Sequence, residues 1–209
     1  MTEHLGIMEI LGIAGSVSLL SGWRLYLTVL ATGLAMRYNV LPLPEHLQAL
    51  QVLANPWVMG IAGLAAFMEF FADKVIWLDS VWDTVHTFIR PIGGALLTLA
   101  VIDPSDPATQ AIAFILGGGA SLLAHGGKAS ARAVVNTSPE PFSNVAVSAV
   151  EDVATTGLLY LAYSHPVAAG VVAVILLILT IALMVIAWRV LKRIVMTVKG
   201  EPQPAAREG

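Results

Sequence analysis

Hydrophobic residues in this 209-residue chain occur in long continuous runs separated by short polar connections. Runs of this kind are typical of membrane-spanning helices, whereas a membrane β-barrel would show alternating segments of about ten residues. The pattern predicts an all-α, polytopic membrane protein with about six to seven hydrophobic segments. These segments cover residues 5–21, 23–37, 57–72, 91–102, 108–124, 145–164 and 166–188.

The first two segments are separated by a glycine, and the sequence leaves their relation open. A helix over residues 5–21 would be about 25 Å long, somewhat short for a hydrocarbon core of ~30 Å. Gly22 interrupts this helix, and residues 23–37 continue with Arg24 near their start. The pair forms a kinked long helix, two separate spans or a re-entrant hairpin.

The connection over residues 38–55 contains prolines and no cation. We expect it to lie outside the membrane, with a short surface helix over residues 45–53. Pro56 directly follows Asn55, a combination that is typical of a helix start and predicts where the next apolar helix begins.

Polar side chains follow one face of the helix expected between residues 79 and 90. Asp79, Asp83, His86 and Arg90 have the spacing i, i+4, i+7 and i+11. One interpretation is an amphipathic helix at the membrane interface whose polar face meets water. The other places Asp79, Asp83 and His86 along an aqueous cavity.

A proline follows this polar stripe. Pro91 predicts a break or kink, because it lacks a backbone donor and crowds the preceding turn. Residues 91–102 are apolar but too short to cross the membrane alone, so we expect a half-helix there.

Glycine, histidine and cations interrupt the apolar pattern over residues 117–144. Backbone groups at membrane depth must be satisfied within the segment or by surrounding protein and water, so a glycine-broken, charged stretch is a candidate site. Residues 15–24 (GSVSLLSGWR) are similar in sequence to residues 118–128 (GGASLLAHGGK). This similarity predicts an internal repeat. The repeat is inverted if residues 91–102 do not cross the membrane, and parallel if they cross it together with the preceding helix.

Composition strengthens the membrane assignment. Hydrophobic residues make up 57% of the chain and charged residues 12%, and the mean hydropathy is +0.80, which leaves too little polar surface for a soluble protein. The chain has no cysteine, which excludes disulfides, thiolate metal sites and cysteine nucleophiles. We expect one transmembrane domain over residues 1–199, a disordered cytoplasmic tail over 200–209, no cofactor and no nucleic-acid partner.

Cations follow the last hydrophobic segment. Since cytoplasmic loops carry an excess of Lys and Arg, Arg189, Lys192 and Arg193 predict a cytoplasmic C-terminus. The loop around Glu140 is then also cytoplasmic, and the turn at His165 lies on the other side. The chain begins without the basic region of a signal peptide, so we expect this segment to remain, on a side that the sequence leaves open.

Two acids lie within an expected span. Placing Glu151 or Asp152 in the bilayer costs about 2.5–3.5 kcal/mol each on insertion scales, so a cationic partner is expected. Arg24, Lys128 and Arg132 are the candidates. The pairs either fasten helices together or take part in substrate binding or proton relay.

The leading functional hypothesis is a small transporter for an anionic solute or a lipid headgroup. The expected substrate-binding residues are Arg24, Ser121, His125, Lys128 and Arg132. The expected coupling or ion-pair residues are Glu69, Asp73, Asp79, Asp83, His86, Glu151 and Asp152. The alternative is a non-transporting scaffold that binds lipids or a partner. In a transporter the charges should converge on a water-accessible cavity, and in a scaffold they should pair in dry helix contacts.

Enzyme function is less favoured, and no catalytic residue is assigned. The sequence contains no HExxH, GxSxG, phosphate-loop or dinucleotide motif. Ser121 and Lys128 match a catalytic dyad in residue type only, and His125 suits a hydrogen-bonded packing role better than catalysis. A divalent-cation site built from His125 and the acids has no recognised motif, so the metal stays unassigned. We expect membrane lipids as partners, and a homodimer because so short a chain leaves little room for a cavity.

Two blocks of sequence resemble a known family. They are Asp73-Lys74 with residues 78–83 (LDSVWD) and 88–91 (FIRP), and residues 136–144 (NTSPEPFSN) with Glu151-Asp152. On these blocks the chain resembles, from about residue 12 to 161, a bacterial multi-pass membrane family catalogued as domain of unknown function 4126. The resemblance implies a bacterial inner (cytoplasmic) membrane, points to the polar blocks as the defining feature, and implies no established activity.

Overall fold

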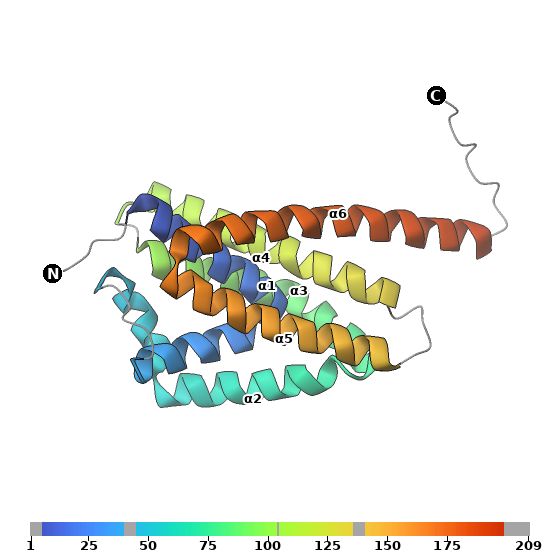
Figure 1. Ribbon diagram of the computed structural model, residues 1–209, viewed down its shortest axis with the longest axis horizontal. Helices are drawn as coiled ribbons and strands as arrows, with labels where there is room; N and C mark the ends of the chain where they lie inside the picture. The colour runs from blue at the N-terminus through green and yellow to red at the C-terminus, as the bar shows by residue number, and fades with distance from the viewer. Residues whose placement is uncertain (1–5, 40–44, 104, 136–140, 199–209) are drawn as a thin grey trace, which may run out of the picture.

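The computed structural model describes residues 6–39, 45–103, 105–135 and 141–198, and these form a bundle of helices without strands (Figure 1). The tail over residues 200–209 and the loop around Glu140 lie outside the described residues. The elements are α1 (Ile7–Arg37), the 3₁₀ helix η1 (Glu45–Ala54), α2 (Pro56–Ala72), α3 (Ile76–Ile102), α4 (Pro107–Val135), α5 (Pro141–Ser164) and α6 (Pro166–Val198).

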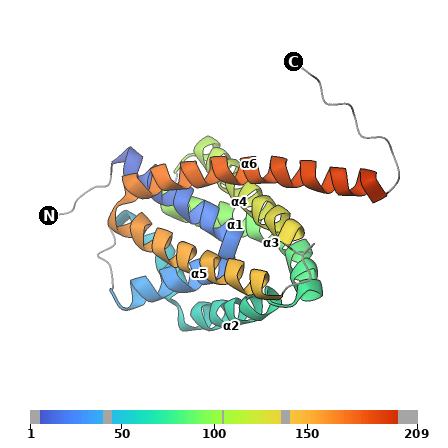
Figure 2. The same cartoon turned by 45° about the vertical axis from the view of Figure 1, so that its right-hand side comes forward.

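α1 is broken in its middle. Arg24 has the extended angles φ −142° and ψ 72°, two residues after the glycine at which the break was expected. The first half runs from the left end of the molecule into the bundle, and the second half leads back to the same end (Figures 1 and 2). Of the three arrangements that the sequence leaves open, α1 therefore adopts the re-entrant one.

The remaining long helices run back and forth between the two ends of the molecule (Figure 1). Within the described residues, five helices are long and apolar enough to cross a membrane, namely α1, α3, α4, α5 and α6, whereas α2 is shorter. A polytopic helical membrane protein is thus confirmed.

The prediction of a separate half-helix at residues 91–102 is wrong. α3 is continuous from Ile76 to Ile102, with Pro91 inside it, so the polar stripe and the apolar segment belong to one long helix. A proline in a helix removes one backbone hydrogen bond without ending the helix when packing on both sides holds the flanking turns.

The glycine-rich stretch of α4 does not break the helix either. α4 is helical throughout Pro107–Val135, although a broken element was expected here. Residues 15–24 and 118–128, which are similar in sequence, therefore differ in conformation, since of these two helices only α1 is interrupted. The internal repeat stays a prediction. Because α3 crosses as one helix, the parallel form is the one compatible with this topology.

Glycines instead allow α1, α3 and α4 to approach one another. A Cβ added to Gly22 would collide with the backbone oxygen of Ser121 and lie 2.7 Å from Ala124 Cβ. A Cβ on Gly94 would lie 2.5 Å from Ser121 Cβ, and one on Gly117 would meet Thr98. Small residues serve in this way at helix crossings in membranes.

Local capping and backbone conformation explain three helix boundaries. The Asn55 side chain accepts a hydrogen bond from the Trp57 amide at 2.9 Å, which confirms the helix start expected there. Asp106 precedes α4, and hydrogen bonds from the hydroxyl and the backbone amide of Thr109 lower the pKa of its carboxyl. Asp103 ends α3 in the left-handed region, with φ 44°.

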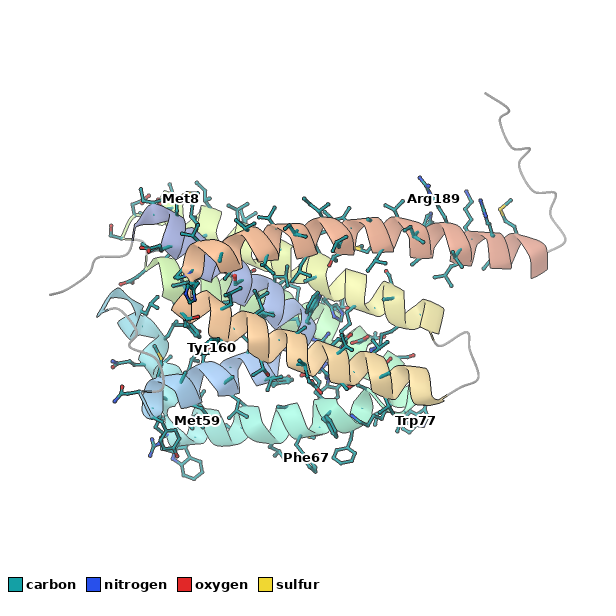
Figure 3. All side chains as sticks on the ribbon, viewed as in Figure 1. Met8, Met59, Phe67, Trp77, Tyr160 and Arg189 are labelled. Atoms are coloured by element: carbon teal, nitrogen blue, oxygen red, sulfur yellow. The ribbon has the colours of Figure 1, made fainter. Side chains whose placement is uncertain are left out.

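The surface of the bundle is apolar and its interior is partly polar, the reverse of a soluble protein. Large apolar side chains point outward, among them Met8 and Phe67, which are 68% and 62% exposed (Figure 3). An apolar surface of this extent needs lipid or another apolar partner. In η1, by contrast, Leu47 and Leu50 are fully buried, so the expected surface helix packs onto the core.

Replacing Gly22 by valine should lower the free energy of unfolding by about 1–3 kcal/mol, because the added atoms overpack the contact between α1 and α4. Thermal unfolding in detergent measures the change. Gly60→Val is the matched control, since a Cβ there meets nothing within 4 Å. Equal melting temperatures for the two variants would contradict the packing role of Gly22.

Candidate functional site

Four cations from three helices are buried in the bundle. The exposed fractions are 1% for Arg24 in α1, 0% for Arg90 in α3, and 4% and 1% for Lys128 and Arg132 in α4. A buried charge without a counter-charge is strongly destabilising, so each cation requires carboxylates. These come from the end of α2, from α3 and from α5, and are Glu69, Asp73, Asp79, Asp83, Glu151 and Asp152.

Asp73, at the end of α2, lies at the centre of the larger group. Its Oδ2 pairs with Arg24 Nη1, and lies 3.3 Å from both Lys128 Nζ and Arg132 Nη2. The side chain is fully buried. One carboxylate therefore ties α2 to α1 and α4. Burial alone would raise the pKa of the Asp73 carboxyl, but the surrounding cations, Lys128 first, hold this pKa below its ordinary value.

α5 supplies two further acids to the same cations. Glu151 Oε2 lies 3.2 Å from Arg132 Nη2, 3.4 Å from Lys128 Nζ and 3.6 Å from Arg24 Nη2. Asp152 Oδ1 lies 2.9 Å from Arg24 Nε, without the alignment of a hydrogen bond, so this contact is electrostatic. These contacts join the two acids to the cations that the sequence offered as candidate partners. Asp79 Oδ1 lies 3.4 Å from Arg132 Nη1. We call the whole group the charge network, and it consists of Arg24, Asp73, Asp79, Lys128, Arg132, Glu151 and Asp152.

A second group, the Arg90 cluster, consists of Arg90, Glu69, Asp83 and His125. Arg90 Nη2 donates to Glu69 Oε1 at 2.5 Å, and its Nη1 lies 3.4 Å from Asp83 Oδ1 and 2.7 Å from His125 Nδ1. A guanidinium only donates, so His125 Nδ1 accepts. The proton of this histidine is then on Nε2, which lies 3.0 Å from Thr87 Oγ1 and 3.1 Å from the Asp83 carbonyl oxygen. This supports the packing role expected for His125.

The two groups meet at the break in α1. Arg90 Nη1 donates to the Gly22 carbonyl oxygen, and Lys128 Nζ donates to the Trp23 carbonyl oxygen, each at 3.3 Å. The last carbonyls of a helix have no partner within it, and in a membrane they need one from the protein. The cations therefore serve both the carboxylates and the broken backbone.

His86 and Ser121, which were also expected at the site, form no ion pair with the charge network and instead make ring and hydrogen-bond contacts. His86 stacks on Trp82, with ring centroids 4.4 Å apart, and its Nε2 lies 2.9 Å from the Tyr26 hydroxyl. The Ser121 hydroxyl donates to the Arg90 carbonyl oxygen at 2.9 Å. Both side chains join one helix to another, which is a packing role.

A pocket of about 200 Å³ lies between α3 and α4 beside the charge network. It is lined by Asp79, Ser80, Asp83, Thr84, Thr87, Ala129, Arg132 and Ala133. Of the three residues that one interpretation placed along an aqueous cavity, Asp79 and Asp83 line this pocket and His86 does not. Among the residues that the structure describes, no group of three His, Cys, Asp or Glu side chains is placed to hold a metal ion.

Comparison with known proteins gives one family. The family described as domain of unknown function (DUF4126) matches residues 11–186, which is most of the chain. This protein belongs to the DUF4126 family. No curated protein and no solved structure matches it.

The polar blocks of this DUF4126 protein hold most of the acids in the charge network and the Arg90 cluster. Asp73, Asp79 and Asp83 fall in the first block, and Glu151 and Asp152 in the second. The blocks are far apart in sequence and come together at one place in the bundle. The described part of the second block begins at residue 141.

Arg90 and Ser148 also belong to the site, although neither was expected there from the sequence. Arg90 completes the polar stripe of α3, so its position on the same face as Asp83 was a usable signal. Ser148 accepts a hydrogen bond from Arg24 Nη2 on its hydroxyl at 2.8 Å. A single serine in an apolar helix carries no signal of this contact.

Replacing Arg90 by methionine should lower the free energy of unfolding by about 3–5 kcal/mol, because Glu69 and Asp83 would remain buried without their cation. The double variant Arg90→Met, Glu69→Met should recover part of the loss, since one uncompensated carboxylate is removed. Denaturant unfolding in micelles of both single variants and the double variant measures this coupling. Additive losses would contradict it.

Proposed function

We propose that this DUF4126 protein is a small secondary transporter for an anionic solute, with its binding site at the break of α1. The break is the observation that carries the proposal. Discontinuous helices whose ends meet charges near the membrane midplane are characteristic of transporter sites. A continuous helix would serve a purely structural protein equally well, without the cost of exposing backbone carbonyls.

The cations around the break suit an anion. Arg24 is shared by Asp73 and by two acids of α5, and the side chains of these two, Glu151 and Asp152, are 14% and 29% exposed. A solute carboxylate or phosphate presents the same oxygen geometry to a guanidinium. We expect the solute to replace the exposed acids on Arg24 while buried Asp73 stays in place.

Charge balance requires a second ion to move with the solute. In the charge network and the Arg90 cluster together, six carboxylates face four cations. A bound anion adds negative charge to a region that is already short of positive charge. Protons or small cations that neutralise the displaced acids would remove this penalty, which makes coupled transport the expected mode.

The alternative is a membrane scaffold whose ion pairs are structural. It is favoured by the low exposure of Arg24 and Asp73, whose side chains are 2% and 0% accessible. It is also favoured by the lining of the pocket beside the charge network, which does not include Arg24, Glu151 or Asp152. In that case the pairs fasten the re-entrant helix to α2 and α5. Buried ion pairs can often be replaced together by apolar residues without loss of stability, so the scaffold would tolerate such a replacement in function as well.

Uptake into liposomes tests the transporter. The purified protein, reconstituted with an acidic outside, should accumulate phosphate or a small carboxylate, and Arg24→Gln should reduce uptake to the level of empty liposomes. Arg189→Gln is the matched control, because Arg189 lies on α6 outside the charge network (Figure 3). Asp152→Asn, at a partly exposed acid, should retain the fold and alter the dependence of uptake on the pH gradient.

Uptake that is indistinguishable from empty liposomes for every anion tried would reject the transporter. Melting temperatures of the variants in detergent separate loss of binding from loss of folding. If native protein transports and folded Arg24→Gln transports equally well, the site assignment is rejected while transport stands.

We also propose that the protein lies in the bacterial inner membrane with α6 ending in the cytoplasm. Arg189, Lys192 and Arg193 near the end of α6 support this orientation. The turn at His165 and the end of α6 lie at opposite ends of the bundle (Figure 1). The natural chain has no cysteine, so single substitutions report position without interference.

In intact cells, His165→Cys should react with a membrane-impermeant maleimide, and Lys192→Cys should react only after permeabilisation. Both positions are exposed on the bundle, so burial would not account for a difference between them. Labelling of Lys192→Cys but not His165→Cys in intact cells would show the reverse orientation.

A further inference from the structure

Six of the eight residues that line the pocket between α3 and α4 carry polar side-chain groups, while most of the surface that faces the pocket is apolar. The polar groups are the carboxylates of Asp79 and Asp83, three hydroxyls and the guanidinium of Arg132. The volume of about 200 Å³ is larger than a single small ion and leaves room for water.

The threonine hydroxyls of this pocket present acceptors. Thr84 Oγ1 donates its proton to the Ser80 carbonyl oxygen at 2.7 Å, and Thr87 Oγ1 donates to the Asp83 carbonyl oxygen at 2.9 Å. Each hydroxyl has one proton, so only lone pairs remain for a ligand, and Thr87 Oγ1 also lies 3.0 Å from the protonated Nε2 of His125. Together with two carboxylates, these oxygens suit a hard cation and repel an anion.

Asp79 is the residue that points to a missing ligand. It is 1% exposed, and its Oδ1 accepts no hydrogen bond from the residues that the structure describes. The nearest cationic atom is Arg132 Nη1 at 3.4 Å, and this atom donates to the Asp73 carbonyl oxygen at 2.8 Å. Arg132 also faces the carboxylates of Asp73 and Glu151, so a single guanidinium is shared among three acids.

We propose that this pocket binds one small monovalent cation, such as sodium, on Asp79. Binding of this cation does not depend on the proposed function. Its role as the ion coupled to transport does rest on that function. Asp83 shares Arg90 with Glu69, and Asp79 shares Arg132 with Asp73 and Glu151, so the negative charge beside the pocket is only partly compensated. A single positive charge on Asp79 offsets part of this excess, and the pocket lining holds two carboxylates and no histidine.

Thermal unfolding in detergent tests binding without any transported solute. Sodium chloride is exchanged for N-methylglucamine chloride at constant ionic strength, so that chloride and screening do not change. A cation that binds the folded state raises the melting temperature as its concentration increases. We expect this rise in the native protein, its loss in Asp79→Asn, and a weaker response in Thr84→Val, which removes one pocket oxygen.

Asp106→Asn is the matched control, because Asp106 is an exposed acid that precedes α4 and lies outside the pocket. It should respond to sodium as the native protein does. If Asp79→Asn does not fold, Thr84→Val carries the test, since the Thr84 hydroxyl donates within its own helix turn and holds no second helix. A melting temperature that is the same in sodium and N-methylglucamine, or an unchanged response in folded Asp79→Asn, would overturn the proposal.

The outcomes distinguish the cation site from the proposed function. A sodium response that requires Asp79, found together with no anion uptake, keeps the cation site and rejects the transporter. Uptake of an anion that is independent of sodium, found together with no sodium response, keeps the transporter and rejects the cation site.

Discussion

The buried ion pairs around Asp73 are the interaction on which the rest of the structure depends. Asp73 holds Arg24, Lys128 and Arg132, and Lys128 in turn donates to the Trp23 carbonyl oxygen at the break of α1. In a low-dielectric interior none of these groups is stable alone. The re-entrant helix, the end of α2 and the C-terminal part of α4 therefore stabilise one another, and each depends on the others for its charge partners.

Close packing brings these charges within reach. Gly22 in α1 lies against α4, and Gly94 in α3 lies against Ser21 and Ser121, so the three helices approach where larger side chains would separate them. Long cationic side chains then reach neighbouring helices. The glycines and the charges belong to one arrangement, in which the glycines set the helix distance and the ion pairs set the register.

The same arrangement leaves negative charge in excess, and this excess connects structure with the proposed activity. Four cations are shared among six carboxylates, and some of the acids, such as Asp79 and Asp152, have only one close cationic contact among the described residues. A structure that only needed to hold helices together would be expected to balance its charges. An excess that can be neutralised by an incoming ion gives the network two states, which coupled transport requires.

The sequence by itself determined the class of protein, because long apolar runs and few charges allow only a helical membrane protein. It also required a cationic partner for Glu151 and Asp152 and offered three candidates, without deciding among them. It did not determine which interruption breaks its helix. Gly22 and the α4 glycines look alike in sequence, and Pro91 looks more disruptive than either, yet only α1 is broken among the described helices. Tertiary structure decided this, because a break at membrane depth persists only where neighbouring side chains bond its carbonyls, and Arg90 and Lys128 come from helices distant in sequence.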